Sequence, residues 1–253
     1  MIPSQAAHDE RTNSTIAERP PLVVELIGPA GAGKSTLLRA LSQRDKSIQP
    51  DIRLSTMRKL PFLISNTSSL LPTFLRHYRH SRWFSWSEAR SMVYLEAWLH
   101  VLRRQPSRND VVTILDHGPL YRLARLRELG PDITTCQIFK RWWASLLTQW
   151  TATLDIVIWL DAPNAFLLER IRARDQKHSL EGKCKHVAYE YLTHYRTFLE
   201  QIISESLSAR PITLLRFDTN QESVEQIVDK VLSTFDSAPN RRQVGNALAV
   251  RLV

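Results

Sequence analysis

The sequence is poor in cysteine and contains no long apolar run. Of its 253 residues only Cys136 and Cys184 are cysteines, and their spacing is not that of a zinc site, so we expect two free thiols. No segment approaches the roughly 18 consecutive apolar residues of a membrane-spanning helix, and residues 1–20 have no apolar signal-peptide centre. These absences predict a cytoplasmic protein without membrane contact.

The basic residues outnumber the acidic ones, but they form no continuous block. The formal net charge is +9, and lysine and arginine are spread over several segments. A charge of this size suits contact with nucleic acid, yet it equally suits a cleft that collects polyanionic nucleotides. Because a nucleic-acid partner would rest on charge alone, we expect none.

Composition and patterning predict a single folded domain with loose ends. A hydrophobic content of 43% and a charged content of 23% are those of an ordinary globular protein. Residues 1–20 are mainly polar and read as a flexible leader, and residues 237–253 as a flexible tail. Residues 21–236 then form one domain, which is a common size for an α/β fold.

Apolar strand-like runs alternate with helical periodicity along this domain. Strands are expected at 22–27, 111–115, 156–160 and 212–217. Helices are expected at 34–41, 87–102, 120–129, 136–150, 164–174, 189–206 and 223–235. Prolines punctuate residues 46–75, which indicates loops and short elements there. The alternation predicts an α/β fold with a parallel sheet and helices on both faces.

A phosphate-binding loop is the strongest motif in the chain. Residues 28–35, GPAGAGKS, satisfy the pattern G-x-x-x-x-G-K-[ST] between a predicted strand and a predicted helix. The glycines let backbone N–H groups turn inward, so that they and the helix N-terminus cradle phosphates. The predicted nucleotide-binding residues are Gly28, Pro29, Ala30, Gly31, Ala32, Gly33, Lys34, Ser35 and Thr36.

The loop predicts ATP and Mg²⁺ as cofactors. Lys34 would neutralise the β- and γ-phosphate oxygens and act in catalysis, while Ser35 would ligate Mg²⁺. Thr36 would continue the first helical turn near the α-phosphate.

Two carboxylates follow buried strands, at the edge where open α/β sheets bind ligands. Asp116 is followed by a His117-Gly118-Pro119 turn, and we predict that it orients Mg²⁺ or accepts the acceptor proton. Asp161 is the alternative acid, although it equally suits a helix N-cap. His117 suits either a turn residue or a contact to the acceptor.

A basic segment after the third strand resembles a lid. Arg170, Arg174 and Lys177 would share one face of a continuing helix, and we predict that Arg170 and Arg174 act in catalysis by contacting phosphate. The predicted lid spans residues 170–185. The alternative is a solvated helix face.

The order of these motifs resembles the thymidylate kinase and deoxynucleoside kinase group of P-loop kinases. The resemblance rests on the P-loop, the Leu160 to Pro163 segment, the lid arginines and Asp218-Thr219, and it runs over residues 22–235. It implies a three-layer fold with a five-stranded parallel sheet, lid arginines that clamp the triphosphate, and adenine near residues 218–220. Members of the group usually carry Asp-Arg or Glu-Arg where this chain has Asp116-His117, which puts the usual arginine contact to the acceptor in doubt.

The acceptor is expected on the side formed by residues 51–105. Cations and rings that could contact it there are Arg53, Arg58, Arg76, Arg79, Arg82, Trp83, Trp86 and Arg90. Packing and solvated surface are the alternative for each of them. Trp142, Trp143 and Trp150 are read as core or interface, which leaves a homodimer open.

These predictions converge on an ATP-dependent phosphotransferase that moves the γ-phosphoryl group to a small acceptor, a nucleotide or nucleoside. The alternative is a nucleotide-dependent ATPase or switch that acts on a protein partner. The chain has no Asn-Lys-x-Asp guanine-reading motif, which argues against a GTPase.

Overall fold

Strand β1 (Leu22–Ile27) lies at the centre of a five-stranded parallel sheet in the order β2-β3-β1-β4-β5. The other strands are β2 (Ile48–Pro50), β3 (Val112–Asp116), β4 (Ile156–Asp161) and β5 (Thr213–Asp218). The computed structural model describes residues 21–50, 61–62, 71, 75, 82–104, 111–173 and 184–238. Because β3 and β4 flank β1 on opposite sides, the carboxyl end of β1 is the point where the strand order reverses.

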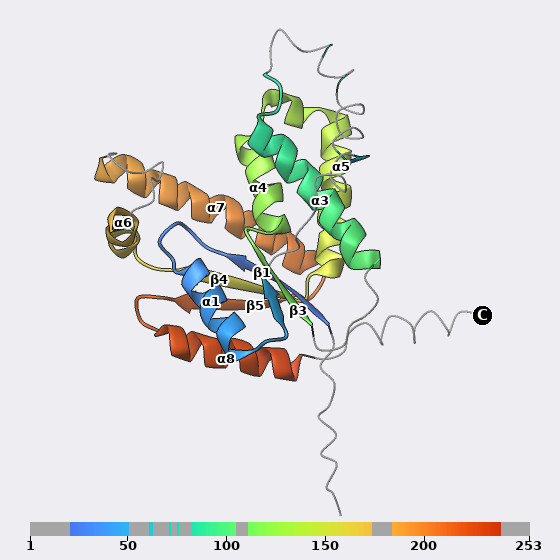
Figure 1. Ribbon diagram of the computed structural model, residues 1–253. Helices are drawn as coiled ribbons and strands as arrows, with labels where there is room; N and C mark the ends of the chain where they lie inside the picture. The colour runs from blue at the N-terminus through green and yellow to red at the C-terminus, as the bar shows by residue number, and fades with distance from the viewer. Residues whose placement is uncertain are drawn as a thin grey trace, which may run out of the picture.

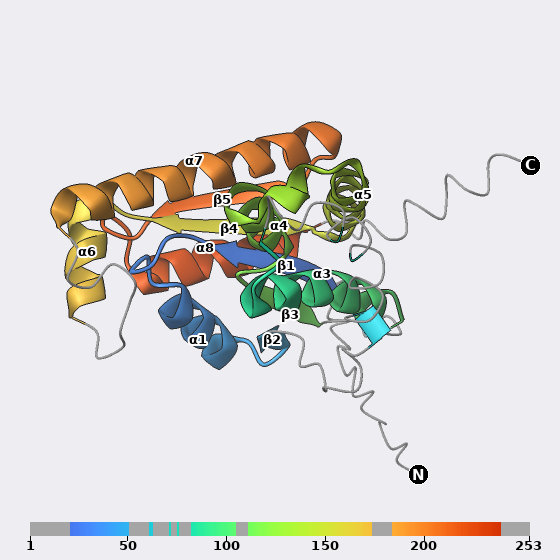
Figure 2. The same cartoon turned by 90° about the horizontal axis from the view of Figure 1, so that it is seen from above.

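Helices cover both faces of the sheet (Figures 1 and 2). On one face lie α3 (Trp86–Arg104), α4 (Pro119–Leu129), α5 (Gln137–Thr153) and α7 (Lys185–Ala209), with the short helix η1 (Asp132–Thr135) before α5. On the other face lie α1 (Lys34–Arg44) and α8 (Val224–Ser237). Helix α6 (Asn164–Arg172) lies beyond the carboxyl ends of the strands. The chain is therefore a three-layer structure.

The side chains of β1 explain why its sequence is almost continuously apolar. Val23 and Ile27 pack against the α3, α4, α5 and α7 layer, whereas Val24 and Leu26 pack against α1 and α8. A central parallel strand buries both faces, so apolar residues occupy both sets of alternate positions. Glu25 is the exception, and it is completely buried.

The four predicted strands are confirmed to within one residue at each end, and the predicted helices are all present. The fifth strand, β2, lies in the stretch where loops and short elements were expected. Helix α6 ends at Arg172, two residues earlier than predicted, and α7 begins at Lys185, four residues earlier.

The structure also describes both cysteines and the tryptophans that were read as core or interface. Both cysteines are free, and Trp150 is fully buried while Trp142 and Trp143 pack partly buried against the same core. Across the described ranges, no helix has both the length and the apolar character needed to cross a bilayer.

Candidate phosphate-binding site at the end of β1

The predicted phosphate-binding loop joins β1 to α1 at the carboxyl edge of the sheet. Its three glycines, Gly28, Gly31 and Gly33, all have positive φ angles, of 151°, 85° and 89°. A Cβ atom on Gly28 would lie 2.2 Å from the carbonyl oxygen of Leu160, so the loop can pass β4 this closely only with glycine. Gly33, the N-cap of α1, faces open space instead. The first turn of α1 thus presents an open, positively polarised helix N-terminus.

Lys34 lies inside this loop rather than in solvent. Its side chain is buried, and Nζ donates to the carbonyl oxygens of Gly28 at 2.7 Å and Pro29 at 3.0 Å. The ammonium group therefore lies within the turn of the loop, next to its first two residues. Ser35 and Thr36 follow it on the exposed side of α1.

The two predicted carboxylates flank the loop. Asp116 ends β3 and pairs in register with Leu26 of β1, and Asp161 ends β4 on the other side of β1. Both are thus at the carboxyl edge, as predicted, but their surroundings differ.

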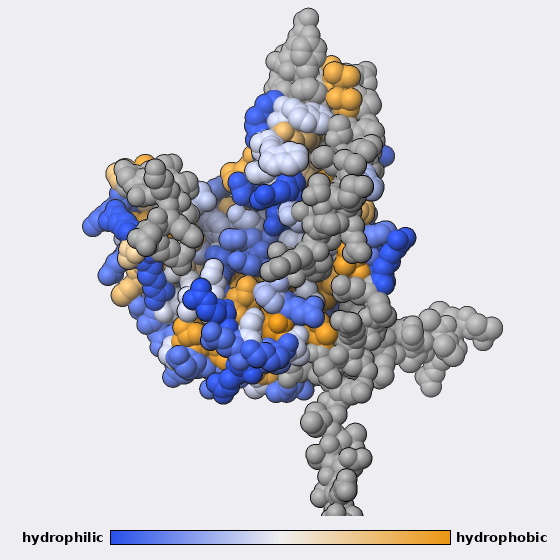
Figure 3. Space-filling view, viewed as in Figure 1, coloured by the Kyte–Doolittle hydropathy of each residue, from blue (hydrophilic) through white to orange (hydrophobic). Residues whose placement is uncertain are grey.

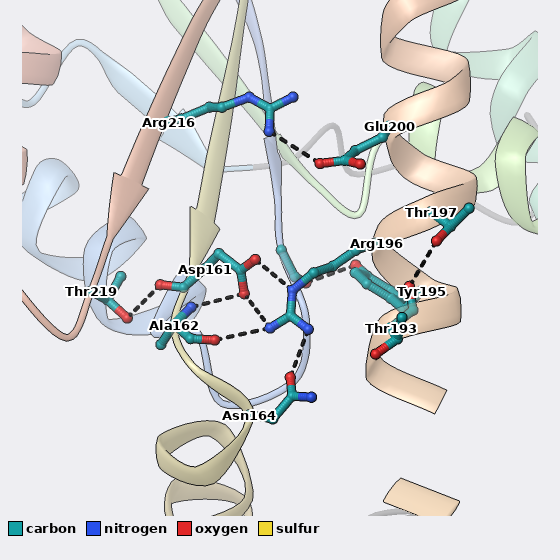
Figure 4. A network of polar contacts seen from close by, with 11 residues as sticks. Asp161, Ala162, Asn164, Thr193, Tyr195, Arg196, Thr197, Glu200, Arg216 and Thr219 are labelled. Carbon is teal, nitrogen blue, oxygen red and sulfur yellow. Dashed lines mark hydrogen bonds and ion pairs between the residues drawn. The ribbon is translucent and has the colours of Figure 1, made fainter. Parts of the chain in front are cut away.

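Asp161 is held by an arginine from α7 (Figure 4). Arg196 donates from Nε to Oδ2 at 2.6 Å and from Nη2 to Oδ1 at 2.9 Å, and it also donates to Asn164 and to the carbonyl of Ala162. The interpretation of Asp161 as a helix N-cap is wrong, because the N-cap of α6 is Pro163. A two-point contact of this kind fixes the end of β4 to α7.

Asp116 lies beside a strained turn. His117 has a φ of 48°, its backbone N–H donates to Leu26 at 3.2 Å, and its Nδ1 lies 3.8 Å from Oδ1 of Asp116. Burial, followed by the charges of Lys34, Arg122 and Arg125, lowers the pKa of His117 well below its usual 6.5. The imidazole is therefore neutral near pH 7, and its contact with Asp116 is not an ion pair.

Arg170 lies over the loop and against the turn after β5. It donates to Oγ1 of Thr219 at 2.8 Å and to the Thr219 carbonyl at 2.9 Å, and its Nη1 is 3.5 Å from the carbonyl of Gly31. Thr219 in turn donates to the carbonyl of Asp161. Arg174 and Lys177 lie outside the described residues, as does most of the predicted lid.

The acceptor side is described only in part. Arg53, Arg58, Arg76 and Arg79 lie outside the described residues. Arg82 makes two 2.7 Å hydrogen bonds to the carboxylate of Glu88, Trp83 packs against the core, and Trp86 is 70% exposed. Arg90 is exposed on α3. Figure 3 shows a largely hydrophilic cleft between the α6 end of α7 and the α3 and α4 side.

Sequence reasoning missed Glu25, which supports the Asp116 turn from inside the sheet. Its carboxylate accepts from the N–H groups of Leu120 at 2.9 Å and Tyr121 at 3.0 Å, at the N-terminus of α4. A Cβ atom on Gly118 would lie 3.0 Å from the Glu25 side chain, so the turn needs a small residue there. The signal was a single charged residue inside an apolar strand run, which is rarely found without a specific partner.

Burial of Glu25 makes folding stability depend on pH. Burial, outweighing the hydrogen bonds from α4, raises the pKa of Glu25 from 4.5 to about 8. The folded state then binds this proton more tightly than the unfolded state, so stability is full below pH 4.5 and is lost as the pH rises through 8. A pKa change from 4.5 to about 8 corresponds to at most roughly 5 kcal/mol.

We therefore expect the free energy of unfolding to fall between pH 5 and pH 9, and to fall much less in Glu25→Gln. Urea denaturation of the wild type and of Glu25→Gln across this pH range measures both free energies of unfolding. Parallel curves for the two proteins would assign the pH dependence to other groups.

Comparison with known proteins agrees with the architecture. No protein-family model and no curated protein matches the chain. Among solved structures, a deoxyadenosine kinase from M. mycoides with bound dCTP matches at 15% identity and a TM-score of 0.50, over 85% of this chain and 100% of that one. A thymidylate kinase from Candida albicans matches at 14% identity and a TM-score of 0.51, over 87% and 93%. The chain therefore has the fold of these P-loop kinases, as its motifs predicted.

Proposed function

We propose that this protein is an ATP-dependent phosphotransferase that moves the γ-phosphoryl group to a small acceptor, a nucleoside or nucleotide. The observation that carries the proposal is the loop at the end of β1, with a buried lysine inside it and a carboxylate beside it on β3. The nucleotide class of acceptor is supported by the fold shared with a deoxyadenosine kinase and a thymidylate kinase.

The residues at the carboxyl edge of the sheet have different roles in the proposed phosphoryl transfer. Backbone N–H groups of residues 30–36 bind the phosphate oxygens, and Lys34 turns from the carbonyls of Gly28 and Pro29 to neutralise the charge on these phosphate oxygens. Arg170, already beside Gly31, and Arg174 add positive charge as the γ-phosphoryl group moves.

The donor set suits Mg²⁺. This ion binds oxygen ligands, and water and phosphate supply several of them, so the protein needs to supply only a few. Ser35 is exposed at the start of α1, and the Asp116 side chain is 33% exposed at the end of β3. These two residues would hold the ion, which when bound neutralises charge between the β- and γ-phosphates.

For a nucleoside acceptor the transfer step is a displacement at phosphorus. The acceptor hydroxyl oxygen bonds to the γ-phosphorus, the bond from that phosphorus to the β–γ bridging oxygen breaks, and ADP leaves with the electron pair. Asp116 accepts the hydroxyl proton. A monophosphate acceptor needs no such proton transfer, and Asp116 then serves the metal alone.

An acceptor screen tests this function. We expect the purified full-length chain, with ATP and Mg²⁺, to form a phosphorylated product from at least one member of a panel of nucleosides, nucleoside monophosphates and sugars. Product detection by mass spectrometry separates transfer from hydrolysis. Hydrolysis that only a protein partner stimulates, without any phosphorylated small molecule, would contradict the kinase and favour a switch.

A further inference from the structure

The carbonyl oxygen of Gly28 accepts two hydrogen bonds from side chains far apart in sequence. Lys34 Nζ donates to it at 2.7 Å, and the hydroxyl of Tyr195 donates to it at 2.7 Å. Tyr195 is buried on α7, so the first residue of the phosphate-binding loop is tied to the helix that follows the predicted lid. Burial raises the pKa of Tyr195 well above 10, which keeps this hydroxyl protonated and able to donate.

The position of Tyr195 is fixed by its neighbours. Its ring packs edge-on against Phe198 at 5.3 Å, and the ring of Tyr121 on α4 lies 6.1 Å away. The next residue, Arg196, binds both carboxylate oxygens of Asp161. Figure 4 shows both side chains extending from α7 toward the ends of the strands. Two consecutive residues of α7 thus hold β1 and β4 at the carboxyl edge.

Binding of a triphosphate would change the contacts that Lys34 makes inside the loop. The Lys34 ammonium has three N–H donors, and two of its hydrogen bonds go to the carbonyls of Gly28 and Pro29, so turning toward oxygens of two phosphates requires it to give up at least one of these carbonyls. Gly28 is buried, and a buried carbonyl that loses its donor without replacement is strongly unfavourable. Tyr195 can remain on Gly28 while Lys34 moves.

We propose that Tyr195 is a positioning residue that keeps the Gly28 carbonyl hydrogen-bonded when Lys34 turns to the phosphates, and so favours triphosphate binding. It touches the loop and not the reacting atoms. The proposal rests on the proposed function, since it concerns the same site.

The test is a double-substitution cycle between Tyr195→Phe and Lys34→Ala. We expect Tyr195→Phe to weaken Mg·ATP binding about tenfold in the presence of Lys34, because the carbonyl then loses its last donor on binding. In the Lys34→Ala background no lysine leaves the Gly28 carbonyl when the nucleotide binds. Adding Tyr195→Phe then removes the last of these two donors equally from the free and the bound protein, so it should not weaken Mg·ATP binding further. Calorimetry gives both affinities, and Tyr191→Phe removes the same group from the same helix as the control.

Thermal unfolding without nucleotide supplies a second measurement. Each single substitution leaves Gly28 with one of these two donors, whereas the double substitution removes both. We therefore expect the double variant to lose more in melting temperature than the sum of the single losses. Additive losses in melting temperature would contradict the proposal that Lys34 and Tyr195 share the Gly28 carbonyl as their acceptor.

The affinity outcomes separate this proposal from the proposed function. If the wild type binds Mg·ATP and Tyr195→Phe binds equally tightly, or if the loss is the same in both Lys34 backgrounds, the role of Tyr195 is overturned while nucleotide binding stands. A wild type that binds no triphosphate overturns both.

Discussion

Replacement of Lys34 by alanine should lower the rate of phosphoryl transfer by about 10³-fold or more, because it removes the ammonium group proposed to neutralise the phosphates from inside the loop. The Lys34 side chain is buried, and its ammonium group donates to the carbonyl oxygens of Gly28 and Pro29 beside the N-terminus of α1. Steady-state assays with the acceptor found by screening measure this change. Circular dichroism should show an intact fold, since the substitution removes the hydrogen bonds to Gly28 and Pro29 at the edge of the sheet and leaves the apolar core in place.

Lys140→Ala is the matched control, because Lys140 is exposed on α5. This variant should transfer phosphate at the wild-type rate. Unchanged turnover in Lys34→Ala, measured in the same assay as Lys140→Ala, would contradict a role of the loop lysine in phosphoryl transfer.

Asp116→Asn should lower the rate of phosphoryl transfer about 10²- to 10⁴-fold, while the affinity for Mg·ATP should change less than about tenfold. An amide accepts no proton and binds a metal ion weakly, but it keeps the shape of the turn beside His117. Rate and affinity are measured separately, by acceptor turnover and by calorimetry.

Asp161→Asn is the same chemical change at the neighbouring strand end, and it should affect stability instead. Its carboxylate is only 28% exposed and holds Arg196 through two hydrogen bonds, so the substitution should lower the free energy of unfolding by about 2 kcal/mol. Turnover by the folded protein should stay near wild type. A large loss of turnover in Asp161→Asn with none in Asp116→Asn would exchange the two assignments.

Local patterns in the sequence were sufficient to predict most of the fold. The buried run at β1 and the helical periodicity of α3 are local signals, and both elements appear where they were expected. Strand β2 was missed because it has three residues, of which only Ile48 is buried, and it ends at Pro50. Its place in the sheet depends on pairing with β3, which a local pattern does not contain.

The site was predictable where its geometry is local, and not where it depends on contacts between distant segments. The nucleotide-binding residues predicted from Gly28 to Thr36 form one continuous motif. The difference between Asp116 and Asp161 comes from Arg196, which is 35 residues beyond Asp161 on α7. Tyr195 reaches Gly28 across 167 residues, and no spacing rule predicts that contact.

Calorimetric titration of the wild-type chain with Mg·ATP tests the binding site most directly. The structure predicts saturable heat for one site, with a dissociation constant between about 1 μM and 1 mM, as is usual for enzyme substrates. The same titration of Lys34→Ala should give much weaker binding. If the wild type releases or absorbs no heat with Mg·ATP, the loop at the end of β1 does not bind a triphosphate, and the proposed phosphotransferase is contradicted.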